Sequence, residues 1–224
     1  MFPELHIIDL SNNEFTGFLP SVYFKTWNAM RNLIAESLTY MHSIGFVFSV
    51  EYNYNYRSIY NYSMTLTNKG VNMEFTHVLD VFTVIDLSSN RFQGEIPDSI
   101  GNLVGLQLLN LPNNFLLGQI PPVIGSLSHL EALDLSWNKL VGRIPWQLRQ
   151  LNFLAVFNVS HNHLTGPIPQ GGQFNTFDNS SFDGNLGLCG NSLSKKCEDS
   201  ETSLSPPSST SEEDEDLVSF FHFG

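Results

Sequence analysis

Residues 130–151 read LEALDLSWNKLVGRIPWQLRQL, and the same order of residue types returns along the chain at a fixed interval. A tripeptide of an acid or amide, an aliphatic residue and Ser or Pro begins at positions 86, 110, 134 and 158, which are evenly spaced. An earlier copy of the unit occupies residues 2–23. Repetition at this period indicates stacked units, each of which needs neighbours to bury its apolar face.

Each repeated position has a physical reason. Leu133 and Leu135 alternate with polar residues, which is the period of a half-buried strand, so neighbouring copies are expected to align their strands in parallel. Asn138 follows the strand, where its amide can hydrogen-bond backbone groups of the turn. Gly142 is expected to allow a tight turn, and Pro145 to fix an extended segment.

Charge and composition exclude several classes of protein. The 224 residues carry a net charge of −12, and eight of the 22 acids lie between Glu198 and Asp216, with no Lys or Arg after Lys196. Without a basic cluster, a nucleic-acid partner is excluded. The apolar runs fall short of the ~20 residues that span a bilayer, and Met1–Leu10 lacks the pattern of a signal peptide.

The period stops between Pro20 and Leu79. Ser21–Glu36 is predicted to be helical, because it places Phe24, Trp27, Met30 and Ile34 roughly on one face. Tyr52–Tyr56 alternates as a strand does, and Thr65–Glu74 reads as two strands around an Asn-Lys-Gly turn.

The repeat resembles the plant-specific class of leucine-rich repeats, LxxLxxLDLSxNxLxGxIPxxLxxL. This resemblance implies an α/β-type repeat solenoid of 24-residue units, with a parallel β-sheet on its concave side and an interrupting island. An island before four terminal repeats, followed by GGQFNTFDNSSFDGNLGLCG (171–190), resembles the receptor-like proteins of plants. The expected parts are a repeat (1–20), the island (21–78), four repeats (79–174), a cap (175–197) and an acidic juxtamembrane-like tail (198–224).

The resemblance of the cap also implies covalent features. It implies a disulfide between Cys189 and Cys197. Such a bridge forms in an oxidising, secretory compartment, which is therefore the expected location. N-glycosylation sequons begin at Asn61, Asn158 and Asn179. A glycan at Asn158 would lie on the concave face.

The concave strand positions are the default binding surface of a solenoid. Trp137 is the sharpest candidate, since Trp is enriched at interface hot spots; the alternative is that it packs on Asn113 and His161. Asp86 and Asp134 stand where the repeat consensus has Asp, which favours a structural role. The full set of concave candidates is Asp86, Ser88, Asn110, Asn113, Asp134, Ser136, Trp137 and His161.

Other candidate sites are weaker. Tyr52, Tyr54 and Tyr56 could contact a partner, or could fold the island back onto the solenoid wall. His161-Asn162-His163 has no acidic or thiolate residue nearby in sequence, so no metal site is expected. No catalytic motif is found, and the sequence predicts neither an enzyme nor a cofactor.

The resemblance implies the ligand- and co-receptor-binding part of a plasma-membrane receptor-like protein without a kinase, facing the extracellular side, in defence or development. Its expected partners are a receptor kinase co-receptor or adapter ectodomain and an extracellular peptide, protein or glycan. One alternative is a secreted inhibitor of a cell-wall-degrading enzyme, although such inhibitors resemble an uninterrupted solenoid. Another is a non-functional truncated receptor whose apolar edge near Leu5, Ile8 and Leu10 is exposed.

The alternation of residues 133–135 generates a first prediction. Leu133→Asp should lower the free energy of unfolding far more than Asp134→Ala, because the first change buries an unpaired charge, whereas the second alters a residue expected to face solvent. Thermal melting of the two variants measures the difference, and equal losses would show the assignment of the strand faces to be wrong.

Overall fold

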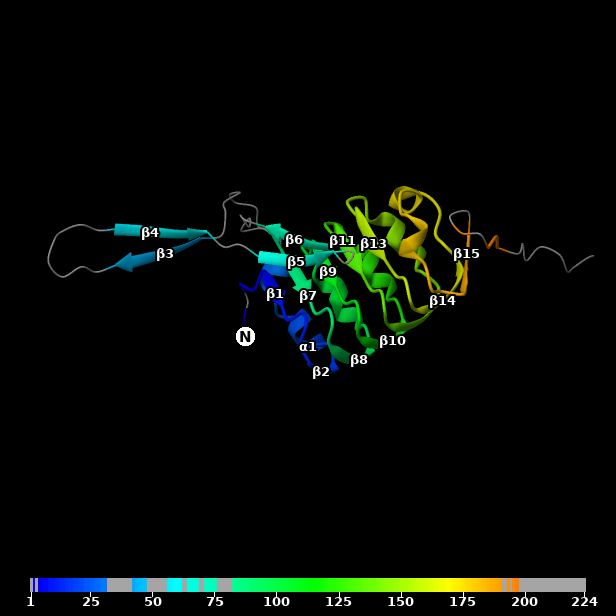
Figure 1. Ribbon diagram of the computed structural model, residues 1–224, viewed down its shortest axis with the longest axis horizontal. Helices are drawn as coiled ribbons and strands as arrows, with labels where there is room; N and C mark the ends of the chain where they lie inside the picture. The colour runs from blue at the N-terminus through cyan, green and yellow to red at the C-terminus, as the bar shows by residue number, and fades with distance from the viewer. Residues whose placement is uncertain are drawn as a thin grey trace, which may run out of the picture.

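Two β-sheets, each made of parallel strands, run along the stack of repeats (Figure 1). The computed structural model describes residues 2, 4–31, 42–47, 56–61, 64–68, 71–75, 82–190, 193 and 195–197. The predicted sheet has five strands, one from each repeat, and every neighbouring pair is parallel, as expected. The strands are β1 (Ile7–Asp9), β7 (Val84–Asp86), β9 (Leu108–Asn110), β11 (Ala132–Asp134) and β13 (Val156–Asn158).

The second sheet lies where the sequence analysis expects only a turn. Its six strands are β2 (Thr16–Phe18), β8 (Arg91–Glu95), β10 (Phe115–Gln119), β12 (Lys139–Gly142), β14 (His163–Pro167) and β15 (Gly187–Cys189). Gly142 adopts φ +81° within β12, and a Cβ there would lie 3.1 Å from Cγ of Gln119 in the preceding repeat. The glycine is therefore needed both for its left-handed backbone and for close packing between repeats.

Short helices form the third side of the coil. Pro97, Pro121 and Pro145 hold an extended backbone immediately before η1 (Asp98–Asn102), η2 (Pro122–Ser126) and η3 (Trp146–Gln150). The repeated leucines and isoleucines of all three sides meet in one buried core. Burial of this continuous row of side chains is what holds neighbouring repeats together.

The first repeat docks directly onto the second, although the whole island separates Asp9 from Asp86 in the sequence. Ile7, Ile8 and Asp9 pair in register with Val84, Ile85 and Asp86. Residues 21–31, assigned to the island from the sequence, continue this repeat as α1 (Ser21–Phe24) and α2 (Asn28–Arg31). Phe24, Trp27 and Met30 are buried in the common core, as the predicted apolar face requires, whereas residues 32–36 lie outside the described residues.

The described part of the island consists of two antiparallel hairpins. β3 (His42–Val47) pairs with β4 (Tyr56–Asn61), and β5 (Met64–Asn68) pairs with β6 (Val71–Phe75). The second hairpin confirms the two strands predicted within Thr65–Glu74. Figure 1 shows β3–β4 extending away from the solenoid and β5–β6 drawn near its N-terminal strands.

Asparagine side chains connect the repeats. Nδ2 of Asn138 lies within 3.2 Å of the carbonyl oxygens of Leu135 and Ser136 in its own turn and of Leu111 in the preceding repeat. Its Oδ1 accepts a hydrogen bond from the backbone N–H of Leu116 at 3.0 Å. The equivalent asparagines are also buried and repeat this pattern: Asn90, Asn114, Asn162 and Asn185.

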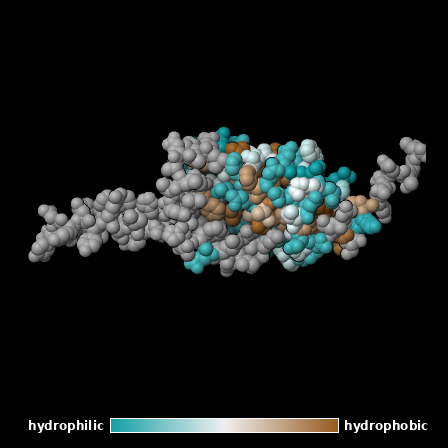
Figure 2. All heavy atoms as spheres, turned by 90° about the horizontal axis from the view of Figure 1, so that it is seen from above, coloured by the Kyte–Doolittle hydropathy of each residue, from teal (hydrophilic) through white to brown (hydrophobic). Residues whose placement is uncertain are grey.

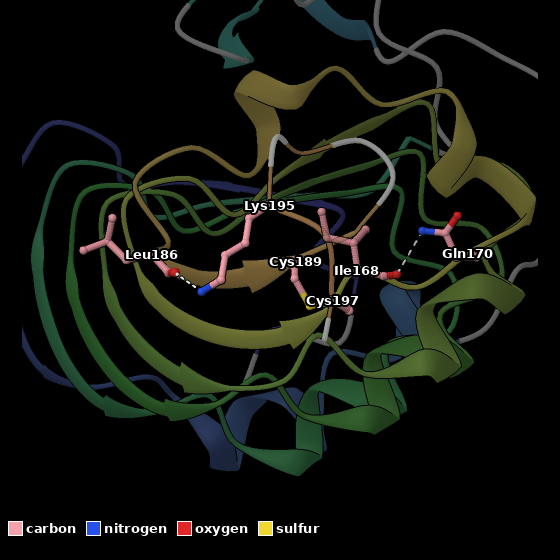
Figure 3. Close-up of a disulfide and its surroundings, with 6 residues drawn as sticks. All are labelled: Ile168, Gln170, Leu186, Cys189, Lys195 and Cys197. Atoms are coloured by element: carbon pink, nitrogen blue, oxygen red, sulfur yellow. Dashed lines mark hydrogen bonds between the residues drawn. A yellow bond between two sulfur atoms is a disulfide. The ribbon is translucent and has the colours of Figure 1, made fainter. Parts of the chain in front are cut away.

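The cap is a shortened repeat. Asn185 supplies the last of these asparagines, and β15 extends the second sheet by pairing with β14. The carbonyls of Ser181 and Asp183 accept hydrogen bonds from the N–H groups of Val159 and His161, so the cap satisfies donors in the segment that follows β13. η4 (Gly172–Asn175) and η5 (Asn179–Ser181) cover the core end, and the implied Cys189–Cys197 disulfide is present (Figure 3).

Within the parts of the chain that the structure describes, no helix has the length and apolar character of a bilayer span.

A second prediction follows from the asparagine contacts. Asn138→Ala should lower the free energy of unfolding by about 2–4 kcal/mol, because it leaves buried backbone groups of two repeats without partners. The exposed Asn152, replaced by Ala, is the matched control and should change stability by no more than about 0.5 kcal/mol. Urea unfolding measures both, and similar losses would contradict the role given to Asn138.

Candidate functional site

Most of the concave candidates are buried, and several of their side chains form hydrogen bonds within a repeat or between neighbouring repeats. Asp86, Ser88, Asn110, Asp134 and Ser136 each expose 4% or less of their surface. They cannot offer a free surface to a partner in this structure. The accessible members of the predicted set are Asn113, Trp137 and His161.

An alternation of acid and amide explains the buried polar row. Asn110 donates to Oδ2 of Asp86 at 3.2 Å, and Asn158 donates to Oδ2 of Asp134 at 3.5 Å. Donors of one repeat therefore meet acceptors of the preceding repeat. The structural alternative for the aspartates fits this geometry, whereas the description of Asp134 as solvent-facing is wrong.

Asp134 is the ionisable group that this arrangement perturbs. Its Oδ1 accepts hydrogen bonds from the N–H of Ser136 at 2.9 Å and from the Ser136 hydroxyl at 2.7 Å. Burial raises the pKa of Asp134 above its ordinary value, although the hydrogen bonds from Ser136 and Asn158 act in the opposite direction. The carboxylate of Asp86 raises this pKa further.

The exposed row lies one residue before each connecting asparagine. Its non-glycine members all adopt a left-handed backbone, with φ between +52° and +55°. This conformation turns the chain out of the concave strand and places the side chains at its C-terminal edge. The members are Asn12, Ser89, Asn113, Trp137 and His161, and Gly184 takes the same place in the cap with φ +74°.

Trp137 and His161 form one exposed unit in this row. Their ring centroids are 3.8 Å apart with an interplanar angle of 21°, and Trp137 remains 58% exposed. On its other side, His161 packs so closely on Gly184 that a Cβ there would lie 2.8 Å from Nδ1. The expected packing of Trp137 on His161 is therefore found, whereas Asn113 donates to Ser89 Oγ instead.

A second aromatic stack lies at the opposite ends of the same two strands. His129, before β11, stacks on Phe153, before β13, with centroids 6.3 Å apart and planes at 13°. Nδ1 of His129 is 3.2 Å from the carbonyl oxygen of Val104, and Phe153 is 63% exposed. This pair was not predicted from the sequence, although residues 129 and 153 occupy equivalent positions in successive repeats and could have indicated it. β11 and β13 are thus flanked by a histidine–aromatic stack at each end.

Between these stacks the floor of the surface consists of both apolar and polar side chains. Val156 and Asn158 of β13 are partly exposed, whereas Ala132 and Asp134 of β11 are buried. Seen from above, hydrophilic residues gather over the C-terminal repeats, with hydrophobic residues showing between them (Figure 2). A shallow, mixed surface with exposed aromatic rings suits a protein partner.

An apolar hollow of about 480 Å³ lies at the other end of the stack. It opens onto the core beside β1 and is separate from the concave edge. Its lining includes Leu5, Ile8 and Leu10, the residues expected to be exposed there, together with Phe15, Tyr23 and Trp27.

The remaining predicted sites have mixed outcomes. Tyr52 and Tyr54 lie outside the described residues, and Tyr56 and Asn61 are the end residues of β4. Asn158 uses Oδ1 to accept from the N–H of Ser160, so its amide is engaged in the row of acids and amides. Asn179 is exposed at the start of η5, where a glycan has room.

No metal-binding arrangement appears among the described residues. Groups of three or more His, Cys, Asp or Glu side chains that could hold an ion are absent there. The surface built by Trp137, His161, His129 and Phe153 offers stacking and hydrogen bonding, which are the chemistry of recognition.

Comparisons with known proteins agree with this architecture. The family profile described as Leucine Rich Repeat matches residues 4–25, 82–103, 105–127 and 129–151. Receptor-like protein 34 of Arabidopsis thaliana is 59% identical over 224 residues, which cover 98% of this chain and 22% of that protein. Receptor-like protein 53 of the same plant is 58% identical over 227 residues, with the same two coverages.

A solved structure gives a similar result. The leucine-rich-repeat ectodomain of the plant membrane receptor kinase GASSHO1/SCHENGEN3 from Arabidopsis thaliana, in complex with CASPARIAN STRIP INTEGRITY FACTOR 2, aligns with a TM-score of 0.59 and 30% identity. The alignment covers 87% of this chain and 17% of the ectodomain. The chain thus spans about a fifth of the length of the curated relatives.

A third prediction concerns Asp134. Because its folded-state pKa is raised, the unfolded chain loses this proton at a lower pH, so folding becomes less favourable as pH rises from about 4 through the raised pKa. Asp134→Asn removes this titration. The stability of the native protein relative to the variant should therefore fall as pH rises over this interval and then stay level, as measured by urea unfolding at several pH values. A relative stability that rises with pH would contradict the assignment.

Proposed function

The chain belongs to the plant leucine-rich-repeat receptor-like proteins, and on that premise we propose that it is part of an extracellular binding surface that recruits a receptor kinase through its terminal repeats. It is a binding module and not an enzyme. The proposal rests on identity of 58–59% to receptor-like proteins over 98% of the chain, taken together with an exposed aromatic edge in the last two repeats.

The proposed contact surface is the C-terminal edge of the concave sheet. Trp137 is held by its stack on His161, and His161 is held against Gly184 of the cap. A ring that is already ordered loses little conformational entropy when a partner covers it. Its large exposed area then contributes to binding, as expected of a hot-spot residue.

The second stack widens the proposed surface. Since His129 and Phe153 flank the same strands as Trp137 and His161, a partner lying across β11 and β13 would meet aromatic rings at both edges. Such a partner is an extended peptide segment or a protein loop, which is consistent with the complex of the related ectodomain with a protein factor. Between the two edges Asn158 is partly exposed and offers a polar group to such a partner.

The finer assignment is a co-receptor kinase ectodomain of the somatic embryogenesis type at the plasma membrane, in defence or developmental signalling. The resemblance of the island and of the four terminal repeats to the receptor-like proteins supports this partner. The island residues Tyr52, Tyr54 and Tyr56 are included in the proposed surface.

A fourth prediction tests the aromatic edge. Trp137→Ala should weaken association with a co-receptor kinase ectodomain by about 1 kcal/mol or more, which is about fivefold in Kd, without changing the melting temperature. Purified ectodomains and a panel of such kinases provide the measurement. Trp146→Ala is the matched control, since Trp146 is similarly exposed at 61% but lies on η3.

The control decides the interpretation. The expected result is weaker binding for Trp137→Ala and unchanged binding for Trp146→Ala. If neither Trp137→Ala nor replacement of Tyr52, Tyr54 and Tyr56 affects association with any kinase of the panel, the proposed surface is rejected.

A further inference from the structure

The outer face of the six-stranded sheet changes its charge along the solenoid. One exposed position, directly after each connecting asparagine, carries Glu14, Arg91, Phe115, Lys139 and His163 in successive repeats. A second exposed position, further along the same strands, carries Phe18, Glu95, Gln119, Arg143 and Pro167. Acids therefore occur in the first two repeats of this face, whereas the fourth repeat presents only cations.

Within the described part of the chain, the cations of the fourth repeat have no carboxylate partner. The ion pair that forms there is Arg91–Glu14 at 3.1 Å, at the other end of this face. Lys139 Nζ lies 5.3 Å from the centroid of the Phe115 ring. Lys139 and Arg143 thus form an uncompensated positive patch at β12.

Arg143 extends this patch toward the cap. Its Cγ and Nε lie 3.2 Å from the place that a Cβ of Gly166 would occupy, so its side chain passes over β14. Gly166 is paired with Leu188 of β15. Beside the start of β15, Lys195 Nζ donates to the carbonyl oxygen of Leu186 at 3.2 Å (Figure 3). We call Lys139 and Arg143, together with Lys195 at the start of β15, the cationic face.

The acidic segment of the chain begins beside this face. Cys197 is bonded to Cys189, the last residue of β15, so the disulfide fixes the point from which residues 198–224 continue (Figure 3). Glu198, Asp199 and Glu201 follow at once, and consecutive acids occupy 212–216. No Lys or Arg follows Lys196 to neutralise them.

The distances allow contact. β15 and β12 are two strands apart, which is about 10 Å at the usual spacing of strands. An extended chain covers about 3.3 Å per residue, so roughly three or four residues after Cys197, the span of Glu198–Glu201, are sufficient to reach the Arg143 end of β12. The strand pairing places Cys189 level with this end, so Lys139, at the start of β12, is further away along the strand. The acids at 212–216 have the longer reach that Lys139 requires.

We propose that the cationic face binds the acidic segment 198–216 of the same chain. A single exposed ion pair contributes only about 0–1 kcal/mol, but several acids on a short tether act at an effective concentration in the millimolar range. The contact is therefore reversible and sensitive to salt. It occupies the outer face of the second sheet and leaves the aromatic edge free, so it is independent of the proposed function.

Zero-length cross-linking tests this contact in the full chain. A carbodiimide joins a carboxylate to a lysine amine only where the two touch, so Lys139 should be linked to peptides from 198–216 in the monomer at low ionic strength. Lys25, an exposed lysine of the first repeat, is the matched control and should not be linked. Sodium chloride at about 0.5 M should reduce the Lys139 links at least about fivefold, because it screens exposed charges.

A variant separates docking from random encounter. Arg143→Glu should reduce the Lys139 links at least about threefold, since it adds a like charge beside the acids, while the melting temperature is unchanged. Equal links to Lys25 and Lys139, links found only in dimers, or the absence of Lys139 links at low salt would each overturn the proposal. Cross-links found only in dimers would show that the cationic face binds the acidic segment of a second copy of the chain.

Discussion

The structure depends on one recurring interaction, the side-chain amide of asparagine bonded to the backbone of two repeats. A leucine-rich coil turns sharply after each concave strand, and the turn leaves carbonyl and N–H groups inside the protein. Asn138 satisfies groups of its own turn and of the preceding repeat at the same time. Because buried backbone groups without partners cost about 1–3 kcal/mol each, this residue fixes both the turn and the register of stacking.

The functional edge follows from the same turn. The residue before each connecting asparagine must adopt a left-handed backbone, and this conformation projects its side chain outward. The backbone conformation at this position is therefore fixed by the turn, whereas the identity of the side chain can vary. Ser89 and Asn113 fill it with small polar groups, whereas Trp137 and His161 place two stacked rings there. A scaffold that holds the main chain and varies the exposed side chain suits molecular recognition.

Periodicity revealed most of the fold because each repeated residue has one dominant role. Leu133 and Leu135 predicted a parallel sheet, and the asparagine at 138 predicted the bonded turn. The second sheet was not predicted, since the segment around Gly142 reads as a turn when its neighbours in space are unknown. The burial of Asp86 and Asp134 was also not predicted from the sequence. The alternation of polar and apolar residues indicates which face of the strand a side chain lies on, but not which residues surround it. The pairing of Asp134 with Asn158 depends on contacts between repeats.

The candidate site was predicted only in part, for related reasons. Trp137 was predicted because Trp is enriched at interface hot spots. The stack of His129 on Phe153 lies in the segments leading into the strands, where the repeat consensus prescribes no residue. The cap was recognised by resemblance, but its role as a shortened repeat became clear from Asn185 and from the pairing of β15 with β14.

The docking of β1 onto β7 across the island has a consequence for the order of folding. The later strands of the concave sheet join partners one repeat away, whereas Asp9 and Asp86 are separated by the island as well. Closing the longer loop costs about 1 kcal/mol more in chain entropy. We therefore expect the second to fifth repeats to form first and the first repeat to add last. Changes in the length of the island should alter the rate of that final step, while the contacts of the finished coil stay the same.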